Sequence, residues 1–383
     1  MAGFNWTTCE IRMTASGGVY HGTTADLANI PSDADATMSF SHEYVHFLQL
    51  ISSLSGLRLL GELIDLGVKG TLILSGHVEG EQIMVRHKML PLLAAQADHA
   101  GVANPIFRPR LRYLNEQASI LFSSQDYPYT GAEPAWSLVQ QVVTVGTYTE
   151  QFIGIVTPRA TFRPITPGML AEGMARRIDQ LLKTNEGFAH HDWANNEIEE
   201  EFYNGIFNVL SQADYENNVA PATVQRLTIV LCWLALGSIR PDWAMAVMLG
   251  RLKENRSAGG LVATIAITLR DLLMSRDVDL LKASTFNEVV EDLQHGAGNV
   301  IDRTEYLPIY AQLKNIHRAG NLVFAHPEYF ADESIGWGHV REWMSMFTVP
   351  RVVADDGDVD SIDGVECTPT VTDFLREIVR VFS

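Results

Sequence analysis

The 383-residue chain is poor in cysteine, in basic residues and in long apolar runs, and each shortage excludes a class of protein. Its three cysteines, Cys9, Cys232 and Cys367, form no CxxC pair, so they build neither a disulfide framework nor a thiolate zinc site. Lys and Arg number 28 against 46 Asp and Glu, a net charge of −18, which weighs against partners that carry phosphate. The longest apolar run, near residues 227–239, is too short to span a bilayer.

Composition and the start of the chain predict a folded protein of the cytoplasm. Hydrophobic residues make up 46% of the chain and charged residues 19%, so the chain can bury a large core and whole-chain disorder is excluded. The first residues, MAGFNWTTCE, contain neither the basic nor the apolar segment of a secretory signal. We therefore expect a soluble cytoplasmic protein without nucleic-acid or membrane partners, and its oligomeric state stays open.

The spacing of apolar residues predicts a mainly α fold of the α+β class. Apolar residues recur every three to four positions in several segments, as they do on the buried face of a helix. These segments are Gln82–Gln96, Gly168–Lys183, Glu197–Gln212, Thr223–Gly237, Trp243–Leu252 and Leu261–Met274. Because no linker divides them, we expect one large domain over residues 1–383.

Other stretches depart from the helical pattern. Residues 1–30 are expected to form a β edge region with a hairpin, because apolar residues such as Ile11 and Met13 alternate there. Residues 122–167 are rich in Thr, Pro, Gly and aromatic residues, which predicts an irregular excursion over the helical body. Residues 350–383 are expected to form an acidic loop and a short terminal helix.

A further helix, expected over residues 31–56 with Ser32 as its N-cap, contains the HExxH sequence HEYVH. Residues four apart on a helix lie one turn apart on the same face, so the imidazoles of His42 and His46 can reach one metal ion. Glu43 lies beside the first His, where it can activate a metal-bound water as general base, since zinc lowers the pKa of that water to about 7.

Two segments, read together, suggest a family: HEYVHFLQ, residues 42–49, and MLAEGMARRID, residues 169–179. They resemble the zincin metallopeptidases, and more closely their gluzincin branch. Bacterial peptidases of this kind carry HExxHxxQ followed at a distance by E-G-x-A on a helix, and the Glu of the second motif is their third zinc ligand. The resemblance therefore implies a zincin-like active-site helix, with Zn²⁺ held by His42, His46 and Glu172.

The third ligand has several candidates. Two His alone hold zinc loosely, so a further ligand is chemically required. Glu172 is favoured because the small residues Gly173 and Ala175 would let its helix pack closely against the His helix. However, the gap from His46 to Glu172 is long for a gluzincin. The nearer acidic candidates are Glu62, Glu79 and Glu81.

Supporting roles are assigned from position along the chain. Tyr203 is the first choice for an oxyanion donor because it follows Glu172 on the next expected helix, and the alternative donors lie in residues 190–192 (HHD). Asp179 lies two turns beyond Glu172 and can brace the site. Gln49 shares a face with both His residues, where it either hydrogen-bonds the site or caps a neighbouring backbone group.

The motif thus predicts a zinc-dependent metallopeptidase that acts on a protein or peptide substrate. Two His and one carboxylate suit zinc best, and iron is the alternative metal. One competing hypothesis is a metal-dependent hydrolase that uses the same ligands on a small molecule, in a narrow pocket enclosed by residues 122–167. The other is a non-catalytic helical interaction protein in which the metal is structural or absent.

Overall fold

A computed structural model describes residues 2–5, 10–13, 23–30, 33–53, 55–56, 126–145, 148–187, 197–212, 221–238, 241–254, 323–324 and 335–367. The chain divides into two compact units. Unit 1 comprises Met1–Ala118, Asn287–Ala319 and Trp337–Ser383, and unit 2 comprises Ser119–Phe286 and Gly320–Gly336. The chain passes between the units more than once, so no single linker marks the division. The structure thus has two units where the sequence predicts one domain.

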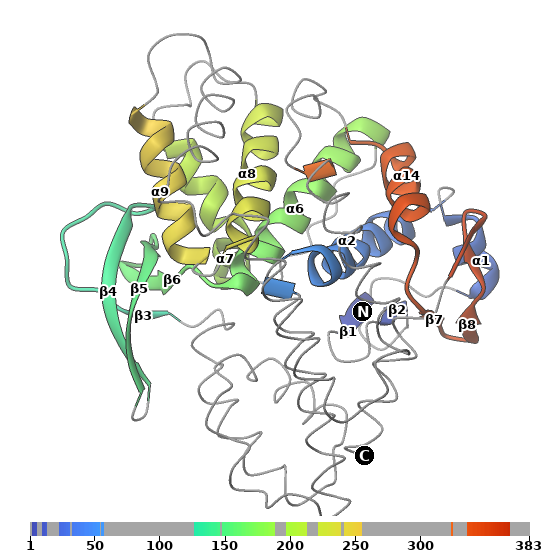
Figure 1. The fold of residues 1–383 in the computed structure, drawn as a ribbon, viewed down its shortest axis with the longest axis horizontal. Coiled ribbons are helices and arrows are strands. Elements are labelled where there is room, and N and C mark those ends of the chain that lie inside the picture. The colour runs from blue at the N-terminus through green and yellow to red at the C-terminus, as the bar shows by residue number, and fades with distance from the viewer. Residues whose placement is uncertain are drawn as a thin grey trace, which may run out of the picture. The chain divides into compact units, whose positions relative to one another are not determined.

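Unit 1 contains a four-stranded sheet in the order β1-β2-β7-β8 (Figure 1). Its strands are β1 (Ala2–Asn5), β2 (Glu10–Met13), β7 (Val352–Ala354) and β8 (Gly357–Val359). β1 and β2 form an antiparallel hairpin in which Phe4 pairs with Ile11. β2 also pairs in parallel with β7, so the expected N-terminal hairpin is completed by strands from the other end of the sequence.

Three described helices belong to unit 1: α1 (Thr24–Ala28), α2 (Ala34–Ser52) and α14 (Trp337–Phe347). α2 contacts β1, β2 and α14. Sequence reasoning missed α14, although its buried residues Trp337, Val340, Met344 and Phe347 follow the spacing of one helical face. Together these elements surround α2, the helix that carries the HExxH sequence.

Hydrogen bonds define both ends of α2. Asp33 is the N-cap, and its Oδ1 accepts a hydrogen bond from the backbone N of Ala36 at 2.9 Å. The predicted N-cap at Ser32 is therefore wrong by one residue, because serine and aspartate are both good caps and sequence alone does not choose between neighbours. At the other end, Ser53 donates its backbone N–H to the carbonyl of Gln49 at 3.2 Å, and the helix ends at Ser52.

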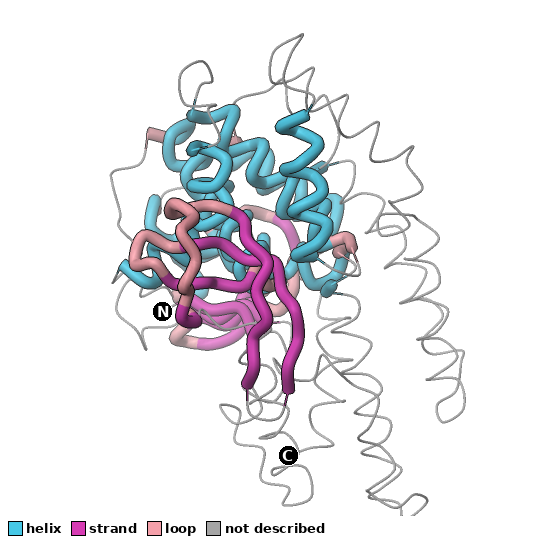
Figure 2. The backbone as a smooth tube through the Cα atoms, turned by 90° about the vertical axis from the view of Figure 1, so that its left-hand side faces the viewer, coloured by secondary structure: helices cyan, strands magenta, loops and turns pink. Residues whose placement is uncertain are grey.

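Unit 2 contains an antiparallel sheet in the order β3-β6-β5-β4, whose longest strands run side by side in Figure 2. The strands are β3 (Tyr127–Pro128), β4 (Leu138–Val145), β5 (Tyr148–Val156) and β6 (Thr161–Pro164). The irregular excursion predicted for residues 122–167 is therefore wrong where the structure describes it. Its β-branched and aromatic residues build strands and a core of Val143, Phe152 and Phe162.

The remaining helices of unit 2 confirm four of the predicted helical segments. They are α6 (Pro167–Glu186), α7 (Glu197–Leu210), α8 (Pro221–Leu236) and α9 (Pro241–Glu254). α6 begins after the N-cap Thr166 with Pro167 in its first turn, and it ends at Gly187 in the left-handed conformation. The predicted helices Gln82–Gln96 and Leu261–Met274 lie outside the described residues.

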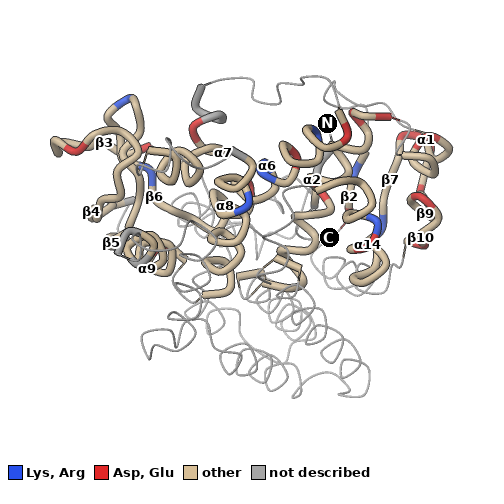
Figure 3. Tube along the Cα trace, turned by 90° about the horizontal axis from the view of Figure 1, so that it is seen from above, with Lys and Arg blue, Asp and Glu red and all other residues tan. Residues whose placement is uncertain are grey.

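The acidic segment near the C-terminus is strand-forming and not a loop. β7 and β8 form one hairpin, and β9 (Ser361–Ile362) and β10 (Val365–Glu366) form a second. Figure 3 shows acidic positions close to α1 and along this segment. Asp356 accepts a hydrogen bond from the backbone N of Thr24 at 2.8 Å, so part of this charge caps the start of α1. The predicted terminal helix lies outside the described residues.

The described ranges thus combine seven helices with small sheets, which makes the fold α+β. None of these helices is both long enough and apolar enough to cross a membrane.

Candidate metal site

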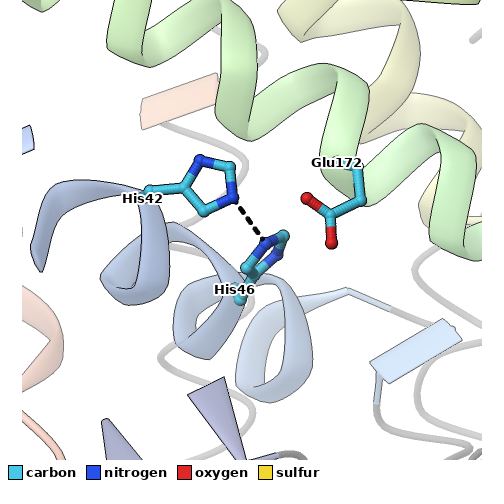
Figure 4. Close-up of side chains that lie close together, drawn as sticks. All are labelled: His42, His46 and Glu172. Carbon is cyan, nitrogen blue, oxygen red and sulfur yellow. Dashed lines mark hydrogen bonds between the residues drawn. The ribbon is translucent and has the colours of Figure 1, made fainter. Parts of the chain in front are cut away.

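His42 and His46 lie one turn apart on α2 with their rings close together (Figure 4). The ring centroids are 4.8 Å apart and the planes meet at 86°. The two Nε2 atoms are 3.2 Å apart, and His46 is buried with 3% of its surface exposed. The helix therefore brings one nitrogen of each ring to the same point, as the HExxH spacing predicts.

This separation fits a shared metal ion. Zn²⁺ binds imidazole nitrogen at about 2.0–2.1 Å in a tetrahedral arrangement, which places two such nitrogens about 3.3 Å apart. The observed Nε2···Nε2 distance of 3.2 Å already meets that requirement. The helix α2 alone thus brings two possible ligand atoms to a spacing that suits one ion.

Aromatic packing within unit 1 holds this part of α2 in place. The ring of Phe40 stacks on Tyr44 at 5.6 Å and meets Trp337 of α14 edge-on at 6.2 Å. Phe47 packs against Phe4 of β1 at 6.3 Å. Since these rings are buried on the faces of α2 around the His residues, the helix has little freedom to rotate and move its imidazoles apart.

Tyr44, the residue between Glu43 and Val45, ties the motif to the end of α14. It is fully buried, and its hydroxyl donates a hydrogen bond to the carbonyl of Thr348 at 2.8 Å. Burial raises the pKa of the Tyr44 phenol well above its ordinary value, because the phenolate would lose its hydration. The hydroxyl therefore stays protonated and remains a donor.

Gln49 contacts the imidazole of His46 directly. Its side-chain Oε1 lies 2.9 Å from Nδ1 of His46, and both side chains are buried. Of the two roles that the sequence left open for Gln49, this contact supports the hydrogen bond to the site.

Glu172 completes the group. Its carboxylate and the ring nitrogens of His42 and His46 all lie within 4.8 Å of one another (Figure 4). His42 and Glu172 are partly exposed while His46 is buried. These three residues can hold a metal ion, and they are the three ligands that the resemblance to gluzincins implies.

Within unit 2, α6 is fixed by contacts close to Glu172. The guanidinium of Arg177 lies 4.4 Å from the ring centroid of Phe207 and donates a hydrogen bond to Oδ1 of Asn204. Both partners are on α7, so the turn that follows Glu172 is anchored to the neighbouring helix.

The small residue after Glu172, Gly173, lies against other helices of unit 2. A Cβ on Gly173 would lie 3.5 Å from the carbonyl oxygen of Tyr203 and 4.0 Å from Sγ of Cys232. Gly173 therefore faces α7 and α8 within unit 2. That Gly173 and Ala175 let this helix pack closely against the His helix stays a prediction.

The other predicted site residues have different outcomes. Glu43 is partly exposed on α2, and Tyr203 is partly exposed on α7, where its ring meets that of Phe202 edge-on at 6.0 Å. Asp179 is buried on α6. The catalytic roles of Glu43 and Tyr203 and the bracing role of Asp179 stay predictions. The alternative ligands Glu62, Glu79 and Glu81 and the alternative donors in residues 190–192 lie outside the described residues.

The chain has no recognisable relative in three comparisons. No protein-family model matches it, and no curated protein or solved structure is significantly similar to it. The function is therefore argued from the site alone.

Proposed function

We propose that this protein is a zinc-dependent metallopeptidase with His42, His46 and Glu172 as its metal ligands. The observation that carries the proposal is the 3.2 Å separation of the two imidazole Nε2 atoms on one helix, with a carboxylate in the same group. Two His and one carboxylate leave a fourth position free on a tetrahedral ion, which is the arrangement of catalytic zinc sites and not of structural ones. The resemblance of HEYVHFLQ and the later Glu-bearing helix to gluzincins supports peptide bonds as the substrate class.

When bound, zinc supplies Lewis acidity, which polarises a carbonyl and lowers the pKa of water. Glu43 follows the first ligand and accepts the proton of the attacking water as general base, then passes it to the leaving amine. Tyr203 donates a hydrogen bond to the oxygen that becomes negative as the carbonyl is attacked. Glu43 and Tyr203 each have one role, so a single substitution can remove one role and leave the other.

The test begins with elemental analysis of the purified full-length chain. We expect about one zinc per chain, and Glu172→Gln should lose most of it, because two imidazoles alone hold the ion weakly. Glu186→Gln is the matched control, since this glutamate ends the same helix in an exposed position. Equal zinc in the wild type and Glu172→Gln would remove Glu172 as a ligand and favour the glutamates at 62, 79 and 81.

Hydrolysis of a mixed fluorogenic peptide library then tests the reaction. Glu43→Gln should keep its zinc and lose activity by about 10²–10⁴-fold, as expected for removal of a general base. Full activity in Glu43→Gln would exclude that role. A zinc-loaded wild type that cleaves no peptide, but does hydrolyse small esters or amides, would favour the small-molecule hydrolase over the peptidase.

A further inference from the structure

We infer that Gln49 is a positioning residue that fixes the tautomer of His46 and thereby directs its metal-binding nitrogen. The inference rests on the proposed function insofar as it concerns metal affinity. It starts from a contact on α2 alone, in which Oε1 of Gln49 lies 2.9 Å from Nδ1 of His46.

The chemistry of the two groups determines where the proton lies. A side-chain amide oxygen only accepts hydrogen bonds, so Nδ1 of His46 must carry the proton that it shares with Gln49. In a neutral imidazole the other nitrogen, Nε2, then has a free lone pair. This is the atom that lies 3.2 Å from Nε2 of His42, where a shared ion would be.

Burial raises the free-energy cost of losing the hydrogen bond between His46 and Gln49. His46 and Gln49 expose only 3% and 2% of their surface, so bulk water has little access to the bond between them. An unpaired donor at such a position costs about 1–3 kcal/mol, which disfavours the ring orientation or tautomer that would break the bond. The proton is thus kept off Nε2 before any metal arrives.

The backbone at Gln49 is held as well. Ser53 donates both its backbone N–H and its hydroxyl to the carbonyl of Gln49, at 3.2 and 2.6 Å. The last turn of α2 is closed at the residue that orients the ring. Gln49 and His46 are three residues apart on one helix. A hydrogen bond between them therefore orients one of the two imidazole ligands before an ion binds.

The first experiment needs no metal. In the ¹⁵N-labelled, metal-free full chain, long-range ¹H–¹⁵N spectra at pH 8 report which nitrogen of each ring is protonated, and His46→Gln identifies the signals of His46. We expect His46 to be protonated at Nδ1 in the wild type and to lose this preference in Gln49→Met. A wild-type ring protonated at Nε2 would overturn the inference, because Gln49 would then donate to the ring instead of accepting from it.

The second experiment measures zinc affinity by competition with a chromophoric chelator. Gln49→Met should bind zinc about 10–100-fold more weakly, the usual effect of removing the hydrogen-bond partner of a ligand. Gln49→Glu keeps an acceptor and should restore affinity close to that of the wild type. Ser52→Ala is the matched control, because it removes a buried hydrogen bond to Leu48 on the same helix and keeps both Gln49 and His46, and its affinity should not change.

The outcomes separate this inference from the proposed function. If the wild type takes up no zinc, the metallopeptidase proposal fails, while the tautomer of the metal-free protein still decides the role of Gln49. If the wild type binds zinc and Gln49→Met binds it equally well, the positioning role is wrong and the metal site stands. A similar loss of affinity in Gln49→Met and Gln49→Glu would likewise overturn it, since the acceptor would then be irrelevant.

Discussion

At the residue scale, the atoms around Gly173 determine whether a larger side chain fits at this position. Gly173 follows the proposed ligand Glu172 in the middle of α6, where glycine is unfavourable because it loses more backbone freedom on folding than alanine does. The space for a Cβ is present, since the nearest atoms would lie in ordinary contact at 3.5 and 4.0 Å. The glycine is therefore not required by packing in unit 2.

Gly173→Ala should raise the free energy of unfolding by about 0.5–1 kcal/mol, because alanine is the better helix former and meets no clash. Chemical denaturation of the metal-free protein measures it. Gly205→Ala on α7 is the control: its Cβ would lie 2.7 Å from Cδ1 of buried Ile155, so part of the gain is lost in moving that side chain. Greater stabilisation by Gly205→Ala than by Gly173→Ala would contradict this reading of the packing.

Cys367 should be unreactive in the folded protein. Burial, together with the nearby charge of Asp360, raises the pKa of its thiol from 9.0 to about 12. Because the thiolate is the nucleophile, a shift of this size leaves about a thousandfold less reactive species at pH 8. Alkylation followed by peptide mapping should show slow modification of the native chain and rapid modification in denaturant. Modification at the rate of an ordinary thiol under native conditions would show that the site is open.

At the element scale, the end of α14 determines how α2 is held. Thr348 directly follows α14 and has a φ of 69°, a left-handed conformation that a β-branched residue rarely adopts. Its carbonyl accepts the hydroxyl of Tyr44. The strained residue thus presents a backbone acceptor to the middle of the HExxH motif, within unit 1.

Thr348→Gly should stabilise the protein by about 1 kcal/mol, because glycine adopts this conformation without a steric cost and keeps the carbonyl in place. Thermal unfolding measures it. Thr348→Ala is the control, since it retains a Cβ and should gain much less. If both variants gained equally, the β-branched side chain of threonine and not the positive φ would be the source of strain.

Tyr44→Phe removes the hydroxyl that donates a hydrogen bond to the carbonyl of Thr348. We expect a loss of about 1–2 kcal/mol in the free energy of unfolding, because the partly buried carbonyl of Thr348 loses its donor while the aromatic packing remains. The measurement is again chemical denaturation. A variant as stable as the wild type would mean that the hydroxyl contributes nothing to holding α2.

Sequence reasoning succeeded for elements whose signal is local and periodic. The helices α6 to α9 follow from apolar spacing, and α2 follows from a cap and an apolar face. It failed for residues 126–164, where a composition typical of irregular structure hid the β-branched runs LVQQVV and FIGIV. Those runs are typical of strands. Which strands pair is seen only in the structure, where Val143 packs with Phe152 and Phe162 across the sheet.

At the scale of the whole molecule, the proposed metal site should contribute to stability when an ion is bound. An ion that binds only the folded chain stabilises it by RT ln(1 + [L]/Kd), about 2.7 kcal/mol at a hundred times Kd. The melting temperature of the chelator-treated protein should therefore rise with zinc concentration and fall again when chelator is added. His46→Gln should abolish the rise, because it removes the buried ligand. A rise of equal size in His46→Gln would place the zinc elsewhere.

The sequence by itself determined the pair of imidazoles, since four residues of helix necessarily bring His42 and His46 to one face, and the structure places their Nε2 atoms 3.2 Å apart. It also suggested Glu172, but only through resemblance, because no local rule relates residues 126 positions apart. Tertiary structure decided that this carboxylate joins the group and that Gln49 faces the ring of His46. The difference lies in sequence separation. Helical geometry depends on residues within one turn of each other, so the sequence shows it directly. Contacts between residues far apart in the sequence depend on how the whole chain packs, which no short segment reveals.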